Sequence, residues 1–164
     1  MAQTFTFAGK IAFIMMRKIL AFLLVLVVAV SCQTDETDYG PIDKKIIEDY
    51  LKANNLTAQS TSSGLYYIIE KPGGAEHPNI NSYVIALYKG YLTDGTVFDE
   101  TSTWYDPILV SGFIKGWQEG LPLIGVKGKI KLLIPSALGY GSEAKTEIPA
   151  NSVLIFDIEL AEFY

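Results

Sequence analysis

The sequence predicts an α+β fold, in which an antiparallel, twisted β-sheet wraps around one short α-helix. Short runs of alternating apolar and polar residues recur between turn signals over the second two thirds of the chain. No crossover helix is indicated between them, and helical periodicity there is confined to about residues 114–121. Strands without crossover helices pair antiparallel, and the single short helix is available to cover the apolar face of their sheet.

The first 31 residues are typical of a signal peptide. A basic pair precedes the apolar run at 19–30, and small residues follow that run. This run is shorter than the about 20 residues that cross a bilayer, so a permanent single-pass anchor is the poorer interpretation, although residues 5–16 are also moderately apolar. An n-region of ordinary length predicts that translation starts at Met15 or Met16.

Cys32 directly follows the signal, and this position resembles a bacterial lipobox, in which the cysteine is diacylated. A spare thiol is the alternative, and a single cysteine excludes an intramolecular disulfide. Residues 32–40 would then be the lipidated cysteine and an acidic tether, anchored in the bacterial cell envelope on the periplasmic face or at the outer-membrane surface. The acidic run at 35–38 is either a solvated linker or a sorting signal.

Composition excludes several other function classes. The net charge is −5, which argues against nucleic-acid binding. With His77 as the only histidine, on a loop-like segment, the sequence predicts no metal site and no cofactor. Ser111 and Ser136 have no histidine base at motif spacing, and no glycine-rich loop ends in the lysine of a phosphate-binding loop.

Residues 41–61 are predicted to form an N-terminal helix and a linker. Pro41 starts a pattern whose apolar residues recur at spacings of three and four, and the pattern ends near Asn54 and Asn55, which tolerate the left-handed conformation. The apolar stripe either packs on the following domain or mediates self-association, and we expect a monomer. A Ser/Thr-rich stretch then marks the start of the main domain, at residues 62–164.

The main domain contains short strand-like runs, one after another. They lie at 65–70, 83–92, 97–99, 108–110, 127–134 and 153–162. In the last of these, Leu154, Phe156 and Ile158 alternate with more polar positions. Because side chains alternate across a strand, Phe156 is expected on the buried face of the sheet.

The segment 86–100 predicts a pocket. Tyr88 lies on an alternating strand, the turn at Asp94 and Gly95 reverses the chain, and Phe98 is followed by Asp99. One hairpin can therefore bring aromatic rings and a carboxylate into a concave site. Taken singly, each ring would be an ordinary core residue, but further aromatic residues lie beside turn glycines, which favours a cleft. Such a cleft suits a compact apolar ring such as proline.

Three more motifs follow in order: Gly116-Trp117-Gln118-Glu119-Gly120, Leu138-Gly139-Tyr140-Gly141 and the run at 148–157. Together with the hairpin they resemble the FK506-binding-protein (FKBP) family of peptidyl-prolyl isomerases over roughly the last hundred residues. The resemblance implies an FKBP-like fold and assigns pocket residues by position. The catalytic residues it implies are Asp99, Tyr88, Phe98 and Tyr140. The substrate-binding residues it implies are Ile108, Phe113, Ile114, Trp117, Ile148 and Phe156.

The resemblance also implies individual roles. Trp117 would form the floor of a proline pocket, Tyr140 would offer its hydroxyl at the edge, and Ile148 would donate its backbone N–H to the substrate. Ile108 stands where the family often has a further phenylalanine, and the connection at 110–112 is shorter than usual. The expected ligands are proline-containing polypeptides and macrolides of the FK506 type.

The leading hypothesis is therefore an exported, lipid-anchored FKBP-type peptidyl-prolyl cis-trans isomerase that assists the folding of exported or envelope proteins. A non-catalytic peptide-binding or holdase chaperone module on a lipoprotein is the alternative. A surface lipoprotein that uses the fold only as a scaffold is a third hypothesis. The barrier to X-Pro rotation comes from amide resonance, so the reaction itself requires neither a nucleophile nor a metal.

Overall fold

The computed structural model describes residues 37–101 and 106–164, so the predicted signal peptide and Cys32 lie outside the described residues. Residues 38–164 form one compact unit. No helix in the described part of the chain is long and apolar enough to span a bilayer. Its elements, in chain order, are α2 (Gly40–Ala53), β1 (Gln59–Ser60), β2 (Tyr66–Lys71), β3 (Tyr83–Tyr91), β4 (Val97–Thr101), β5 (Ile108–Leu109), η1 (Val110–Gly112), α3 (Lys115–Gly120), η2 (Leu121–Leu123), β6 (Lys129–Ile134), η3 (Ser136–Leu138) and β7 (Leu154–Phe163).

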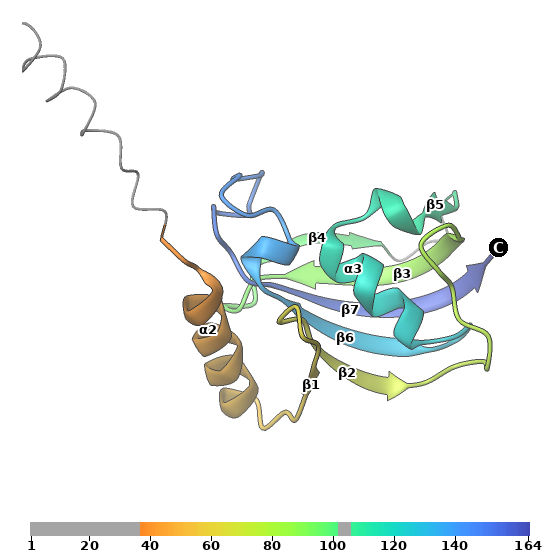
Figure 1. Cartoon of the computed structure of the whole chain (residues 1–164), viewed down its shortest axis with the longest axis horizontal. Helices are drawn as coiled ribbons and strands as arrows, with labels where there is room; N and C mark the ends of the chain where they lie inside the picture. Colours follow the sequence, from red (N-terminus) through yellow and green to blue (C-terminus); the bar gives the residue numbers. More distant parts are fainter. Residues whose placement is uncertain (1–36, 102–105) are drawn as a thin grey trace, which may run out of the picture. The chain divides into compact units, whose positions relative to one another are not determined.

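The strands form one sheet in the order β1-β2-β6-β7-β3-β4, and β5 pairs with the remaining part of β3 (Figure 1). Every strand pairing in the described residues is antiparallel. The C-terminal strand β7 lies in the middle of the sheet, between β6 and β3. The α+β class predicted from the sequence is therefore confirmed, and the predicted strands agree with the observed ones within a few residues at each end.

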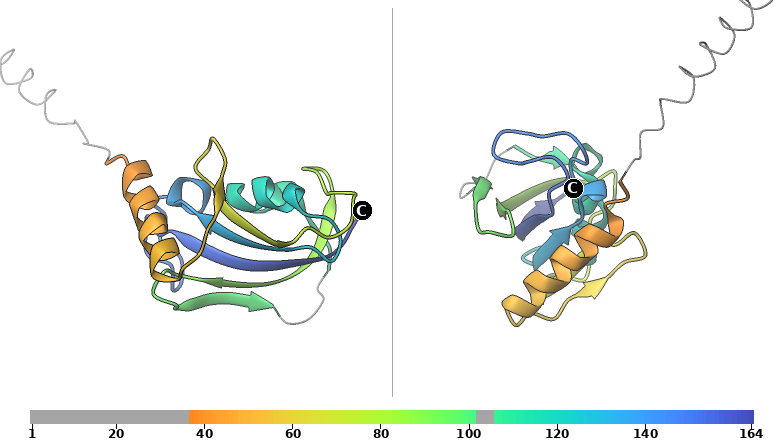
Figure 2. Two further views of the ribbon diagram at one scale, coloured as in Figure 1. Left: turned by 90° about the horizontal axis from the view of Figure 1, so that it is seen from below. Right: turned by 90° about the vertical axis from the view of Figure 1, so that its left-hand side faces the viewer.

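One face of the curved sheet carries the main core, and α3 lies over it (Figure 2). Alternation along β7 sends Leu154, Phe156 and Ile158 to this face, as the sequence predicts, and all three are buried. They join the apolar residues of β6 and the helix residue Trp117 in one cluster. The core beneath α3 is thus built from alternate residues of the two central strands.

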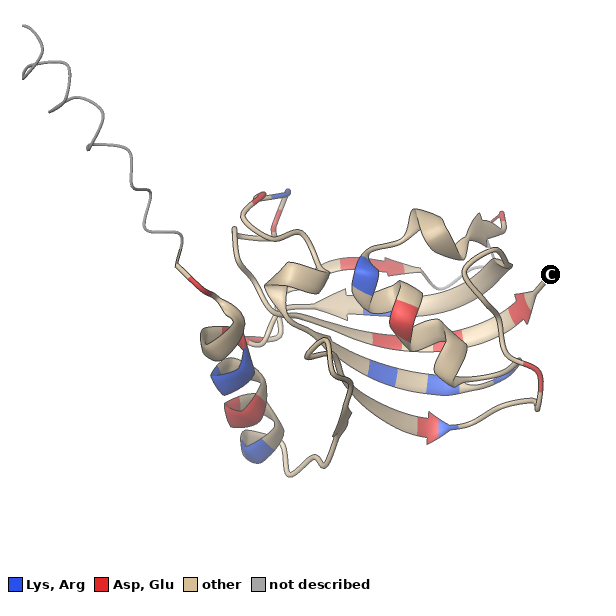
Figure 3. Ribbon diagram, viewed as in Figure 1, with Lys and Arg blue, Asp and Glu red and all other residues tan. Residues whose placement is uncertain are grey.

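Charged residues alternate with uncharged ones along β6 and β7 (Figure 3), and their side chains lie on the face opposite the main core. Lys129 faces Glu159 directly across the two strands, with Nζ 3.0 Å from the carboxylate, and Lys131 forms an ion pair with Asp157 in the same way. These residues alternate with the apolar ones of the main core, so each strand separates a charged face from an apolar face.

The helix α2 covers one end of this second face. Its residues Ile47 and Leu51 are buried against Leu133 and Ile155, whose neighbours in sequence point toward the main core. The predicted stripe therefore packs on the domain. The helix ends as predicted, because Asn55 adopts a left-handed φ of 53°. The compact unit begins at Asp38 and so includes this helix, whose buried side chains join it to the sheet.

Candidate active site

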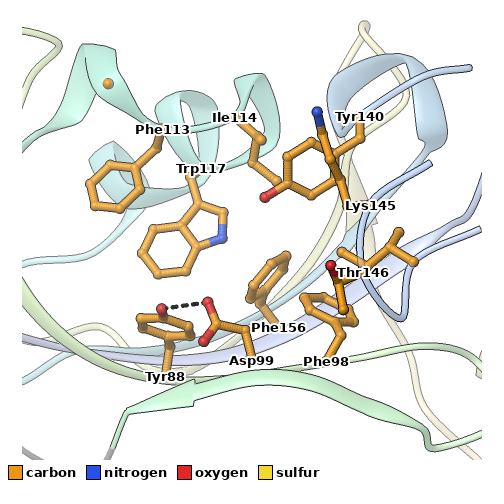
Figure 4. Close-up of a pocket in the computed structure, with 12 residues that line it drawn as sticks. Tyr88, Phe98, Asp99, Phe113, Ile114, Trp117, Tyr140, Lys145, Thr146 and Phe156 are labelled. Atoms are coloured by element: carbon orange, nitrogen blue, oxygen red, sulfur yellow. Dashed lines mark hydrogen bonds between the residues drawn. The ribbon is translucent and has the colours of Figure 1, made fainter. Parts of the chain in front are cut away.

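A pocket of about 590 Å³ opens beside α3, on the apolar face of the sheet (Figure 4). Strands β3, β4 and β7 form one wall, the first turn of α3 forms another, and the loop between η3 and β7 closes the third side. The residues that line it are Tyr88, Phe98, Asp99, Gly112, Phe113, Ile114, Trp117, Tyr140, Lys145, Thr146, Ile148 and Phe156.

Trp117 lies at the centre of the aromatic residues and is only 3% exposed. The rings of Tyr88 and Phe156 meet it edge-on, with centroids 5.2 and 5.3 Å away, and Phe113 stacks on it at 4.7 Å. Phe98 in turn meets Phe156 edge-on at 5.4 Å. Such perpendicular and offset contacts are the favoured geometries of aromatic pairs, so the pocket walls support one another.

Trp117 reaches this position because α3 lies unusually close to β6. A Cβ atom on Gly116 would come within 2.6 Å of Ile134, and one on Gly120 would come equally close to Leu132. Only glycine permits this approach of the helix to the strand. The Gly-Trp motif therefore has a packing reason: the glycines let the helix approach the sheet, and the tryptophan forms the pocket floor between them.

A β-bulge brings Phe98 and Asp99 to the same pocket. In a regular strand two consecutive side chains point to opposite faces. Here Gly90 pairs with Asp99 while Tyr91 pairs with Val97, so Phe98 is the extra residue of a bulge in β4. The bulge bends the strand and lets both neighbours line the cavity.

Asp99 accepts a hydrogen bond of 2.7 Å from the hydroxyl of Tyr88 (Figure 4). The carboxylate is exposed at the pocket mouth, whereas the ring of Tyr88 packs against Trp117 below it. The pair therefore places a negative charge at the rim of an otherwise apolar pocket. The sequence predicted this juxtaposition from the hairpin, and the structure brings the two residues together.

The loop 139–151 supplies the outer rim. Tyr140 is 37% exposed, and its hydroxyl points over the cavity (Figure 4). Lys145 lies 5.6 Å from the centroid of the Tyr140 ring, and the adjacent Glu143 raises the pKa of this lysine through a 2.7 Å ion pair. Neither Lys145 nor Thr146 was expected in the pocket, because nothing in the local sequence pattern marks an exposed loop residue as facing a site.

Two of the predicted site residues differ from the others in their placement or contacts. Ile108 does not line this pocket: it lies in a neighbouring hollow with Pro107 and is 49% exposed, because the short β5 pairs with the far part of β3. Ile148 does line the pocket, but its backbone N–H already donates to the carbonyl oxygen of Lys145 at 3.1 Å in a two-residue bridge. Ile114 also lines the pocket, and its backbone N–H has no hydrogen-bond partner in the part of the chain that the structure describes.

All the other predicted pocket residues converge on the one cavity. His77, expected in an exposed loop away from the pocket, is exposed, and its Nδ1 lies 2.8 Å from the carbonyl oxygen of Pro122. Within residues 37–101 and 106–164, no group of histidine, cysteine and acidic side chains has the arrangement of a metal site. The polar side chains that line the cavity are the hydroxyl-bearing Tyr88, Tyr140 and Thr146, the carboxylate of Asp99 and the ammonium group of Lys145.

Comparisons with known proteins agree with this geometry. The sequence model of the FKBP-type peptidyl-prolyl cis-trans isomerases matches residues 74–161, more than half of the chain. A protein of Buchnera aphidicola named FKBP-type peptidyl-prolyl cis-trans isomerase FkpA is 53% identical over 105 residues, which are 62% of this chain and 42% of the relative. The Escherichia coli protein of the same name is 39% identical over 132 residues, 79% of this chain and 48% of that protein.

The chain thus spans about half the length of the curated relatives it matches. The crystal structure of FkpA from Escherichia coli superimposes with a TM-score of 0.67 and 32% identity, and the match covers 91% of this chain and 71% of that one. The matched sequence region contains the hairpin, the Gly-Trp motif and the loop that build the pocket. The chain therefore belongs to the family of FKBP-type peptidyl-prolyl cis-trans isomerases.

Proposed function

We propose that this protein catalyses cis–trans isomerisation of X-Pro peptide bonds in exported or envelope polypeptides. The observation that carries the proposal is the aromatic pocket with the Tyr88–Asp99 pair at its rim. A prolyl ring fits a cavity with apolar walls and a buried tryptophan floor. The family and the pocket geometry both support this reaction.

The pocket can lower the rotational barrier without covalent chemistry. The planar amide is stabilised by resonance that separates charge, and the barrier of about 18–20 kcal/mol reflects the loss of that resonance at the twisted state. An apolar environment disfavours the charge-separated planar form relative to the twisted one. Donors at the rim that meet the carbonyl oxygen only after rotation would lower the barrier further.

Two donors are placed for that role. The hydroxyl of Tyr140 points over the cavity (Figure 4). Ile114 lines the cavity, and its backbone N–H makes no hydrogen bond among the described residues, so we assign it the second donor role. Asp99 holds the Tyr88 hydroxyl and faces the polarised amide from the opposite side. In this proposal the carboxylate acts by its charge and by holding its neighbour, and it transfers no proton.

Two-dimensional exchange NMR on an apolar-Pro peptide tests the proposal, because it separates turnover from capture. We expect the protein to accelerate cis–trans exchange. The variant Asp99→Val should reduce the rate enhancement roughly ten- to hundredfold and leave peptide affinity within about threefold, because the apolar pocket survives. The control Glu100→Val changes the next residue of β4, which does not line the pocket, and should keep full activity.

The variant Phe98→Ala should lower affinity and exchange together, because it removes one wall. Truncation of a buried phenylalanine costs up to about 3–5 kcal/mol of stability, so the folded state of this variant is checked first by circular dichroism. A folded Asp99→Val protein with full exchange activity would remove the carboxylate from the mechanism. Peptide binding without any exchange enhancement by the unmutated protein would replace the isomerase proposal with the holdase alternative.

We also propose that Cys32 is acylated and that the protein is a lipoprotein of the bacterial cell envelope. The position of Cys32 after an apolar run supports this. Seven residues lie between Cys32 and Gly40, the first residue of α2, so even a fully extended tether would keep the start of α2 within about 28 Å of the anchoring surface. Replacement Cys32→Ser should move the protein from the membrane fraction to the soluble fraction and abolish labelling by an alkynyl fatty acid. A serine variant that stays entirely with the membranes would assign the anchoring to the apolar segment instead.

A further inference from the structure

Asp43 is a buried carboxylate that the proposed reaction does not use. It lies on α2, away from the pocket lining, and its exposed fraction is zero. Its Oδ2 atom accepts two hydrogen bonds, whereas its buried Oδ1 atom has no hydrogen-bond partner among the described residues. Burying a polar atom without a partner is costly, so a group held in this way requires an explanation.

Both hydrogen bonds come from one residue of a different element. Ser136, the first residue of η3, donates its backbone N–H to Asp43 at 2.8 Å and its hydroxyl at 2.7 Å. The carbonyl oxygen of the same serine accepts the N–H groups of Gly139 at 2.9 Å and Gly141 at 2.8 Å. Ser136 is therefore held on one side by α2 and on its other side holds the two residues that flank Tyr140.

This chain of contacts continues into the loop that forms the outer rim of the pocket. The carbonyl oxygen of Gly141 accepts the N–H of Asn151 at 2.7 Å, so both ends of the loop 139–151 depend on the same anchor. We propose that Asp43 is a positioning residue, which fixes the Ser136 turn and thereby holds the Tyr140 hydroxyl over the pocket. The inference rests on the proposed function and extends its machinery to α2, outside the residues that line the site.

Packing alone does not account for Asp43. Ile47 and Leu51 already bury the apolar stripe of α2 against the sheet. An apolar side chain at position 43 would leave no carboxylate oxygen unpaired, but it would deprive the N–H and the hydroxyl of Ser136 of their acceptor. What a carboxylate supplies, and an apolar group cannot, is a double acceptor for the N–H and the hydroxyl of Ser136.

The first test measures the loop and does not depend on catalysis. In the full chain, amide hydrogen exchange at Gly139 and Gly141 is compared for the unmutated protein, Asp43→Ala, Asp43→Asn and the control Ile47→Val. Loss of a charge-assisted anchor should accelerate exchange at both amides about tenfold or more in the alanine variant. The asparagine variant keeps one oxygen that can accept both hydrogen bonds but loses the negative charge, so its exchange rates should fall between those of the unmutated protein and Asp43→Ala. The control loosens helix packing but keeps the anchor, so it should leave the two amides unchanged.

The second test asks whether the effect reaches the pocket through Tyr140. The variant Asp43→Asn retains a side chain of the same shape, so we expect it to remain folded. Its weaker hold on the Ser136 turn should lower peptide affinity and exchange enhancement about fivefold. In a Tyr140→Phe background the same change should cost less than about twofold, because the hydroxyl that Asp43 positions is already absent.

Additive effects of the two substitutions, or equal loop exchange in Asp43→Ala and the unmutated protein, would overturn the inference. The same loop exchange in Ile47→Val as in Asp43→Ala would reduce Asp43 to a packing residue. Failure of the proposed function is recognised separately. If the unmutated protein binds peptide without accelerating exchange, the isomerase proposal fails, while loop exchange and the affinity cycle still test the role of Asp43.

Discussion

Replacing Gly90 with alanine should constrict the pocket from behind. Gly90 lies on β3, directly opposite Phe156 on β7 and Asp99 on β4. A Cβ atom at this position would lie 2.6 Å from Cε2 of Phe98 and 2.7 Å from Cε1 of Phe156. Carbon atoms in contact are normally about 3.5–4.0 Å apart, so each ring must move by about 1 Å or the strand must shift.

The rings can move only toward the cavity that they line, because Gly90 lies behind them. Overpacking of this kind costs about 1–3 kcal/mol. We therefore expect Gly90→Ala to lower the free energy of unfolding by about that amount in urea melts. Peptide affinity and cis–trans exchange should fall about tenfold or more, since a loss of about 1.4 kcal/mol in binding is a factor of ten.

A matched glycine and a compensating change make the experiment specific. Gly74 lies outside the pocket, and a Cβ there would find its nearest atom at 3.8 Å, so Gly74→Ala should leave both stability and exchange nearly unchanged. Adding Phe98→Leu to Gly90→Ala removes the two ring atoms that come closest on that side, so it should restore part of the stability but not the activity. If Gly90→Ala has the same urea midpoint and the same exchange activity as the unmutated protein, the argument from ring crowding is refuted.

Three further predictions concern the rest of the unit. Ile47→Ala should cost about 2–5 kcal/mol, measured by urea unfolding, because this side chain is completely buried between α2 and the sheet. The fragment 62–164 should still fold, as the sequence predicts, but its urea midpoint should be lower because α2 no longer covers the sheet. If circular dichroism shows that the fragment is unfolded, the helix is an integral part of the core. Burial, together with Tyr50 and Asp157, raises the pKa of Tyr91 above its ordinary value of 10.0. The unfolded chain therefore loses this proton first, and stability should fall as pH rises above about 10, with a shallower fall in Tyr91→Phe; equal alkaline slopes would contradict this assignment.

Local periodicity predicted most of the fold. Alternation along β7 placed Phe156 on the buried side, and the apolar spacing after Pro41 predicted a helix that ends near Asn54 and Asn55. These features depend on residues close together in the chain, so they can be read before any tertiary contact is known. The burial of this helix on the sheet could not be read in the same way, because composition marks a linker before residue 62 but does not show what the preceding helix contacts.

The pocket was predicted in its composition but not in its construction. Spacing and resemblance brought Tyr88 and Trp117 to one site, which the structure confirms. The strict alternation of a strand would have separated Phe98 from Asp99, and only the cross-strand register reveals the bulge that joins them. The sequence did not predict Lys145 in the pocket, because an exposed loop has no periodicity from which the direction of its side chains could be inferred.

The sequence by itself determined the class of fold, the faces of the strands and the aromatic residues from which a proline-sized pocket could be built. The tertiary structure decided how those residues are held. Gly116 lets α3 pack closely on β6, and the backbone N–H of Ile148 donates a hydrogen bond to the carbonyl oxygen of Lys145. Asp43 accepts hydrogen bonds from Ser136, 93 positions away in the sequence. The reason is physical: side-chain periodicity is a local property of the backbone, whereas close approach, hydrogen-bond partners and register depend on segments that meet only after the chain has folded.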